Sequence, residues 1–74
     1  MGDIVSSTEI GTLIRRYRQD AGLSQEKLAE MVGVSFQQIQ KYENGANRIS
    51  AGALFELAGF LDKPLLWFFP DRRR

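Results

Sequence analysis

The 74-residue chain contains no cysteine and no histidine. Without cysteine it cannot form disulfides or supply a thiol nucleophile, and without either residue it lacks the usual zinc ligands. The commonest general base at neutral pH is missing as well, and no paired carboxylates stand out in its place. We therefore expect no enzymatic activity, no metal site and no cofactor.

Long apolar runs and a charge excess are also missing. The longest apolar stretch, residues 64–70, is far shorter than the roughly 20 residues that span a bilayer. The first residues show neither the basic start nor the apolar segment of a secretion signal. These features predict a cytoplasmic protein without a membrane partner. Ten basic and nine acidic residues give a net charge of +1, so bulk charge does not by itself indicate nucleic-acid binding.

The composition that remains is that of one small globular domain. Hydrophobic residues make up 43% of the chain and charged residues 26%, which excludes intrinsic disorder. A chain of this length forms only a thin core, so dimerisation or a bound partner would add stability.

The apolar spacing predicts an all-α fold, a compact bundle of five short helices. The first helix begins behind a capping box of Ser6 and Glu9, and Gly22 and Gly33 suit the left-handed residues that end helices. Proline at position 64 favours a last short turn rather than a strand. The expected helices cover residues 7–21, 25–32, about 36–43, 51–61 and 65–69.

Residues 25–42 form the most informative segment, because two short helices joined by a glycine-bearing turn must cross steeply. A side chain larger than that of Ala29 would push the two helices apart, and a Cβ at Gly33 would strain the turn. Ile39 is expected to bury and so fix the second helix on the first. The alternative is a helical hairpin with no special purpose.

Several motifs together resemble the phage-repressor/Cro helix-turn-helix family of bacterial transcription regulators, the XRE type. They are the segments 24–29, 33–35 and 39–45, with the Ile-x-x-Leu-Ile-Arg-x-x-Arg opening at 10–18. The resemblance covers about residues 9–69 and implies a lambda-repressor-like DNA-binding domain with its helix-turn-helix at about 25–43. It leaves an N-terminal arm at 1–8 and a basic tail at 70–74.

The second helix of this unit presents a face rich in neutral hydrogen-bonding groups, where an inert surface helix usually carries Glu and Lys. Glutamine can pair with adenine edges, lysine with guanine, and an apolar side chain with the thymine methyl group. The resemblance places base contacts at Phe36, Gln37 and Lys41, with Ser35 and Gln40 at the margins. A polar residue is more usual at the position of Phe36, which favours a methyl contact there; packing into the core is the alternative.

Contacts to the DNA backbone are expected on both sides of this helix. The resemblance assigns them to Gln25, at the start of the preceding helix, and to Asn44, Asn47 and Arg48 in the following loop. Residues 9–48 include six basic and five acidic residues, so each subunit is expected to neutralise few DNA phosphates. This favours a homodimer on a palindromic operator.

Two further groups of residues have structural or partner roles. The resemblance implies that Arg18 and Glu43 pair to fix the reading helix; two solvated charges are the alternative. In the last turn Leu65 and Phe68 are expected in the core. The remaining apolar side chains of this turn are candidates for contact with a second copy, a protein partner or an additional C-terminal domain: Leu66, Trp67 and Phe69. For Trp67 the alternative is that it covers the core.

These features favour sequence-specific binding of double-stranded DNA by a bacterial or phage transcription regulator that acts as a repressor. The alternative is a protein-interaction module such as the antitoxin of a toxin–antitoxin pair.

Overall fold

The computed structural model describes residues 7–69, and this part of the chain is helical without any strand. Residues 1–6 and 70–74 lie outside the described residues, so Ser6 of the expected capping box, most of the expected arm and the expected basic tail lie outside them too. Four α-helices and one 3-10 turn replace the five expected helices. Their bounds are α1 Ser7–Asp20, α2 Gln25–Val32, α3 Phe36–Glu43, α4 Ala51–Phe60 and η1 Leu65–Phe68.

Serine begins three of these helices. The hydroxyl oxygens of Ser24, Ser35 and Ser50 each accept a hydrogen bond from the backbone N–H three residues on, at 2.9, 3.1 and 3.1 Å. Each bond satisfies a donor that the first helical turn leaves unpaired. The local sequence therefore determines where α2, α3 and α4 begin.

A residue in the left-handed conformation follows the end of each α-helix. Gly22, Gly33 and Gly45 have φ between 73° and 84°, and Asp62 has φ 57°. Glycine adopts this conformation without steric cost, which explains three of the four positions. Asp62 is the exception, because its Cβ makes the same turn less favourable.

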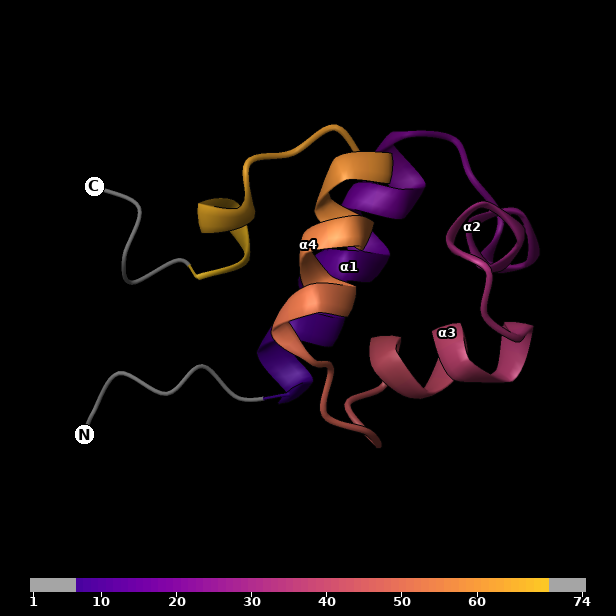
Figure 1. Ribbon diagram of the computed structural model, residues 1–74, viewed down its shortest axis with the longest axis horizontal. Coiled ribbons are helices and arrows are strands. Elements are labelled where there is room, and N and C mark those ends of the chain that lie inside the picture. The colour runs from indigo at the N-terminus through magenta and orange to yellow at the C-terminus, as the bar shows by residue number, and fades with distance from the viewer. Residues whose placement is uncertain (1–6, 70–74) are drawn as a thin grey trace.

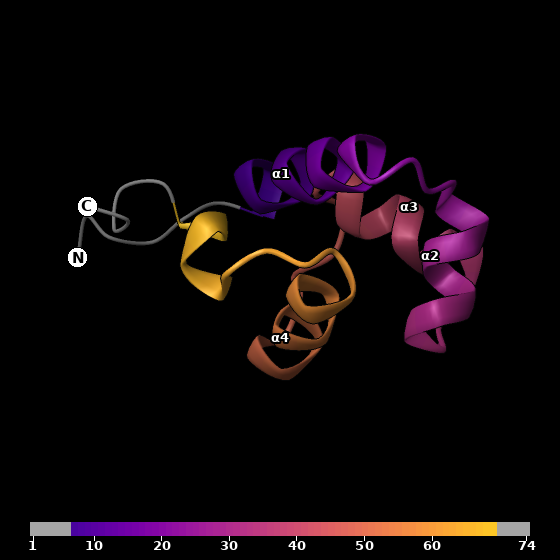
Figure 2. The ribbon, with the colours of Figure 1, turned by 90° about the horizontal axis from the view of Figure 1, so that it is seen from above.

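Figures 1 and 2 show how the helices are arranged. In Figure 1, α2 is seen nearly end-on while α3 lies across the view, so the two cross steeply. Figure 2 shows α2 and α3 at one end of the molecule and η1 at the other, with α1 and α4 in separate layers between them. Contacts of α3 with α1 and α2, and of η1 with α1 and α4, hold this arrangement together.

One apolar core lies among all five elements. Leu13 and Val32 are partly buried at its edge. The buried apolar side chains are Ile10, Ile14, Tyr17, Leu28, Ala29, Ile39, Leu54, Leu57, Ala58, Leu61 and Phe68.

Two expectations for the last turn are wrong. Leu65 was expected in the core, but it is exposed, while Phe69, expected at the surface, is half-buried against the core. The reason is the backbone conformation at the end of η1. The chain leaves the helical conformation at Phe69, with φ −128° and ψ 75°, so this side chain does not continue the turn and packs on the core beside Phe68, while the three side chains before Phe68 are exposed.

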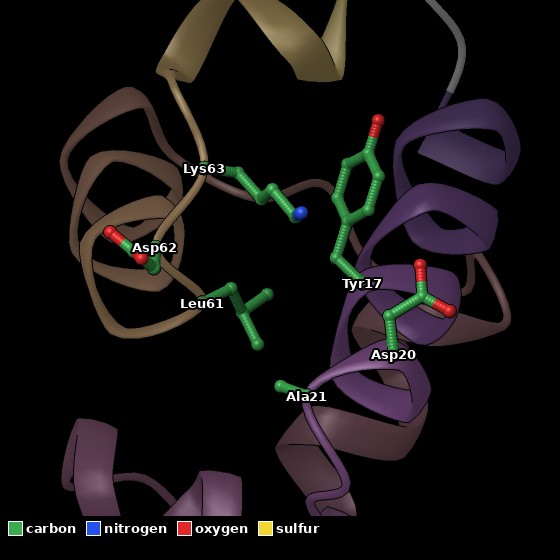
Figure 3. A pocket seen from close by; sticks show the side chains of 6 residues that line it. All are labelled: Tyr17, Asp20, Ala21, Leu61, Asp62 and Lys63. Carbon is green, nitrogen blue, oxygen red and sulfur yellow. The ribbon is translucent and has the colours of Figure 1, made fainter.

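Tyr17 anchors η1 to α1. Its hydroxyl donates to the backbone oxygen of Trp67 at 3.1 Å, and its ring meets that of Phe68 edge to face, with the centroids 5.1 Å apart. Lys63 extends its ammonium group towards the Tyr17 and Trp67 rings, 5.5 and 5.4 Å from their centroids. Figure 3 shows Lys63 reaching Tyr17 beside a hollow between α1 and the segment that follows α4.

That hollow has a volume of about 230 Å³, below the roughly 300–1,000 Å³ of typical small-molecule sites. None of the residues that line it belongs to the set expected to contact DNA. Among the described residues, no helix is both long and apolar enough to cross a membrane.

Candidate nucleic-acid interface

The crossing of α2 and α3 depends on three positions. Ala29 is buried under the crossing, and its carbonyl accepts hydrogen bonds from the N–H groups of the turn, including that of Gly33 at 2.8 Å. Gly33 takes the left-handed conformation, with φ 84°. Ile39 is fully buried, which secures α3 from its inner side. The three residues therefore hold α3 at a fixed angle with its opposite face turned outward.

The outward face of α3 is polar. Among the residues expected to contact bases, Phe36 alone is half-buried, and it does not belong to the partly buried side chains that pack on the core. Part of its surface is therefore exposed at the helix start. The other four are exposed: Ser35, Gln37, Gln40 and Lys41.

The side chain of Ser35 already makes one hydrogen bond within the domain. Its hydroxyl oxygen accepts the N-terminal cap bond of α3 from Gln38, so only its O–H group remains to donate to a ligand. Gln37 and Gln40 extend from the same face, where each amide group presents a donor and an acceptor. The surface therefore contains the kinds of groups that distinguish base edges in the major groove.

The loop after α3 presents exposed polar side chains at Asn44, Asn47 and Arg48. The Asn44 side-chain oxygen accepts from the Ala46 N–H at 2.9 Å, which orients the side chain and leaves its amide hydrogens to donate. Arg48 adds a positive charge to the same loop. Donors of this type are suited to phosphate oxygens.

Glu43, the last residue of α3, is the centre of a buried ionic cluster. Arg18 donates to both of its carboxylate oxygens, Nε to Oε2 and Nη2 to Oε1, the latter at 3.1 Å. Arg15 and Gln25 also donate to Oε1, at 3.4 and 2.9 Å. The cluster therefore ties α1, α2 and α3 together at one point, and it contains the Arg18–Glu43 pair that the family resemblance implies.

The same cluster sets the ionisation of Glu43. Burial alone would raise the pKa of this carboxyl group, but hydrogen bonds from Arg18 and Gln25, the charge of Arg18 and the hydrogen bond from Arg15 together lower its pKa below the ordinary value. Glu43 is therefore an anion at neutral pH. Its charge is balanced within the cluster, as a buried carboxylate requires.

Gln25 has a different side-chain environment from the one expected of a phosphate contact. Its amide nitrogen is already bonded to Glu43, so in this structure the side chain joins α2 to the end of α3. The groups that α2 offers to an anion are the backbone N–H groups of its first turn, of which Ser24 caps that of Lys27.

Sequence reasoning missed three features of the structure. Arg15 joins the Glu43 cluster, which its spacing of three residues from Arg18 on one helix face could have indicated. Gly11 is buried in α1, and the backbone of Tyr42 and Glu43 in α3 lies against its Cβ position. Two large apolar side chains of α4, Phe55 and Phe60, are exposed in addition to those of η1; both lie off the inward stripe of that helix, so the helical spacing could have indicated them.

A steeply crossed helix pair with a buried inner face, a polar outer face and donor-bearing loops on either side defines a DNA-binding helix-turn-helix domain. The chain belongs to the helix-turn-helix family (HTH_3), whose pattern matches residues 14–68. This is the XRE type that the sequence motifs resemble.

Relatives of the chain are named as transcriptional regulators. A protein of Rhodospirillum rubrum, named a transcriptional regulator in the ATPase CF(0) region, is 51% identical over 65 residues, which cover 88% of this chain and 60% of that protein. An HTH-type transcriptional regulator of Sinorhizobium medicae (strain WSM419) is 48% identical over 62 residues, covering 84% and 45% respectively. The chain thus spans about half the length of these relatives.

Solved structures share the fold. The restriction-modification controller protein C.AhdI from Aeromonas hydrophila is 30% identical with a TM-score of 0.80, and the match covers 85% of this chain and 96% of that one. The biofilm master regulator SinR, solved in complex with DNA, is 28% identical with a TM-score of 0.75, covering 80% and 95%.

Proposed function

We propose that this chain is the sequence-specific DNA-binding domain of a transcriptional regulator. The observation that carries the proposal is the exposed polar face of α3, held outward by buried Ile39 and by the Glu43 cluster. The helix enters the major groove, where Gln37 and Lys41 contact base edges and Phe36 contacts a thymine methyl group. Ser35 and Gln40 act at the margins of this contact. The protein regulates by occupying its operator and catalyses no reaction.

Backbone contacts complete the interface. The first turn of α2, at Gln25, and the loop groups Asn44, Asn47 and Arg48 lie on the two sides of α3 and donate to phosphates. SinR, which shares this fold over 80% of the present chain, was solved in complex with DNA, and this supports DNA binding by the domain.

A homodimer on a palindromic operator is the second part of the proposal. An apolar surface of the α4 and η1 side chains Phe55, Phe60, Leu65, Leu66 and Trp67 is exposed, and Phe55 is 67% accessible. Its η1 part lies at the opposite end of the molecule from α2 and α3 (Figure 2), so a second copy bound there leaves both reading helices free. Phe69, one of the residues expected to contact a partner, contributes little because it packs on the core.

The antitoxin alternative gains no support, because the relatives described above are named as transcriptional regulators. The apolar surface would serve a toxin equally well in chemical terms. The two functions differ in which substitutions matter: those on α3 for DNA, and those on the apolar surface for a protein partner.

Selection from a random pool of double-stranded DNA tests the proposal directly. At about 0.1 M salt the domain should enrich an inverted repeat whose half-sites are spaced by about one helical turn, roughly 34 Å. A single enriched half-site would support DNA reading but overturn the dimer. No enrichment by the folded domain would overturn both parts.

The dimer surface has its own test. Phe55→Gln should shift the sedimentation equilibrium towards the monomer and weaken binding to the inverted repeat, while leaving the melting of the monomer nearly unchanged because the side chain is exposed. An unchanged association constant would show that α4 is not the dimer contact.

A further inference from the structure

The ionic cluster around Glu43 contains two cations and one anion. Arg18 and Glu43 are both buried, and together they are neutral. The side chain of Arg15 is 52% exposed, so the excess positive charge of the cluster lies on the residue that reaches the surface.

Glu43 does not need Arg15 to remain paired. Arg18 contacts both carboxylate oxygens and also donates to the backbone oxygen of Leu23 at 2.8 Å, and Gln25 supplies a further bond to Glu43. The Arg15 contact is a single one at 3.4 Å. A long contact from a half-exposed side chain contributes little stability, so Arg15 can leave Glu43 without exposing an unpaired buried charge.

Glu43 links Arg15 to both segments that the proposed function assigns to the DNA backbone. Glu43 directly precedes Asn44 of the loop and is bonded to Gln25, the first residue of α2. The half-exposed Arg15 guanidinium therefore shares its carboxylate partner with the start of α2, and that partner lies one residue along the chain from the start of the loop.

We propose that Arg15 is a DNA-phosphate contact, which exchanges its weak bond to Glu43 for a phosphate of the operator backbone. The inference rests on the proposed function and adds a residue from α1 to the interface. A planar guanidinium forms two parallel hydrogen bonds with phosphate, which a carboxylate already bonded to Arg18 and Gln25 cannot match. The competing explanation is that Arg15 only balances the negative end of the α3 dipole.

Matched variants separate the two explanations. Arg15→Gln and Arg16→Gln remove the same charge from the same helix, but the two side chains project about 100° apart around its axis. Arg16 is exposed and is not part of the Glu43 cluster. Net charge alone would thus affect both variants equally.

The measurement is the affinity for the selected operator as a function of salt between about 50 and 200 mM. For Arg15→Gln the slope of log affinity against log salt should become shallower by about 0.9 per subunit, with the same loss on operator and on scrambled DNA. Arg16→Gln should retain the wild-type slope. Equal slopes in the two variants overturn the proposal.

Two controls keep the outcome interpretable. Arg15→Lys keeps the charge and should restore the slope. If Arg15→Gln melts far below the wild type and Arg15→Lys does not recover the slope, Arg15 is structural and the proposal is wrong. A wild-type domain that binds no DNA would instead contradict the proposed function itself, which the salt series shows before any variant is compared.

Discussion

Gly11 of α1 lies directly against the backbone carbonyl of Tyr42 in α3. A Cβ at this position would overlap the Tyr42 oxygen and would lie 2.6 Å from the backbone oxygen of Glu43. Because the obstacle is backbone, no side-chain rotation relieves it. The close approach of α1 to the end of the reading helix thus requires glycine, and it brings Arg15 and Arg18 within reach of Glu43.

Gly11→Ala should therefore destabilise the domain although alanine is the better helix former. We expect the free energy of unfolding to fall by about 1–3 kcal/mol, the usual cost of overpacking, which corresponds to a decrease in melting temperature of about 4–8 °C per kcal/mol. Gly52→Ala in α4 is the control, because nothing lies within 4 Å of its Cβ position. A Gly11→Ala variant as stable as the control would contradict the packing.

Acidification should remove part of the stability through Glu43. The pKa of this group is lower in the folded state than in the unfolded state, so its contribution is complete above the unfolded pKa and is lost as the pH falls through the folded pKa. Thermal melts of the wild type between about pH 7 and pH 3 should show this loss.

Glu43→Gln should lack that contribution and be less stable at neutral pH by about 3–5 kcal/mol, because the charge of Arg18 is left without its buried partner. Exposed Glu56→Gln should change stability by less than about 0.5 kcal/mol and keep the acid response. Parallel pH profiles for wild type and Glu43→Gln would rule out this source of acid sensitivity.

Asp62 is the one residue other than glycine with positive φ among those that the structure describes. It ends α4, with the Lys63 N–H bonded to the Ala58 oxygen at 3.0 Å. Asp62→Gly should raise the free energy of unfolding by about 0.5–1 kcal/mol, since glycine adopts this conformation more readily. Asp62→Val should lower it by about 1–3 kcal/mol. Chemical denaturation measures the free energy of unfolding of both variants. An Asp62→Gly variant less stable than Asp62→Val would contradict backbone strain at Asp62.

Base reading and phosphate binding predict different mutant profiles. Lys41→Ala should relax the preference at one base position, at a cost of about 1–3 kcal/mol, whereas Arg48→Ala should weaken all sequences alike and make the salt slope shallower by about 0.9. Both side chains are exposed, so neither change should affect melting appreciably. Affinities for the selected operator and for single-base variants provide the measurement. A uniform loss from Lys41→Ala would remove it from the base-reading set.

Local sequence was sufficient wherever one residue type satisfies a local requirement. Ser24, Ser35 and Ser50 begin helices because a hydroxyl satisfies an open backbone donor, and Gly22 and Gly33 end them because they tolerate positive φ. Periodic apolar residues likewise predicted the inward faces, and the helix-turn-helix motif predicted the family. These features depend on neighbours in the chain, so a sequence contains them.

Tertiary structure decided what depends on residues distant in the chain. Three features follow from how the helices meet. Gly11 leaves room for the end of α3, and Gln25 and Arg15 share Glu43 with Arg18. Phe69 rather than Leu65 packs on the core. A local pattern cannot specify which carboxylate a long side chain reaches, because the choice depends on charge and space supplied by other helices. The sequence by itself determined the helices and the class of domain, whereas packing decided which charges are buried, which one is left at the surface and where apolar side chains remain exposed.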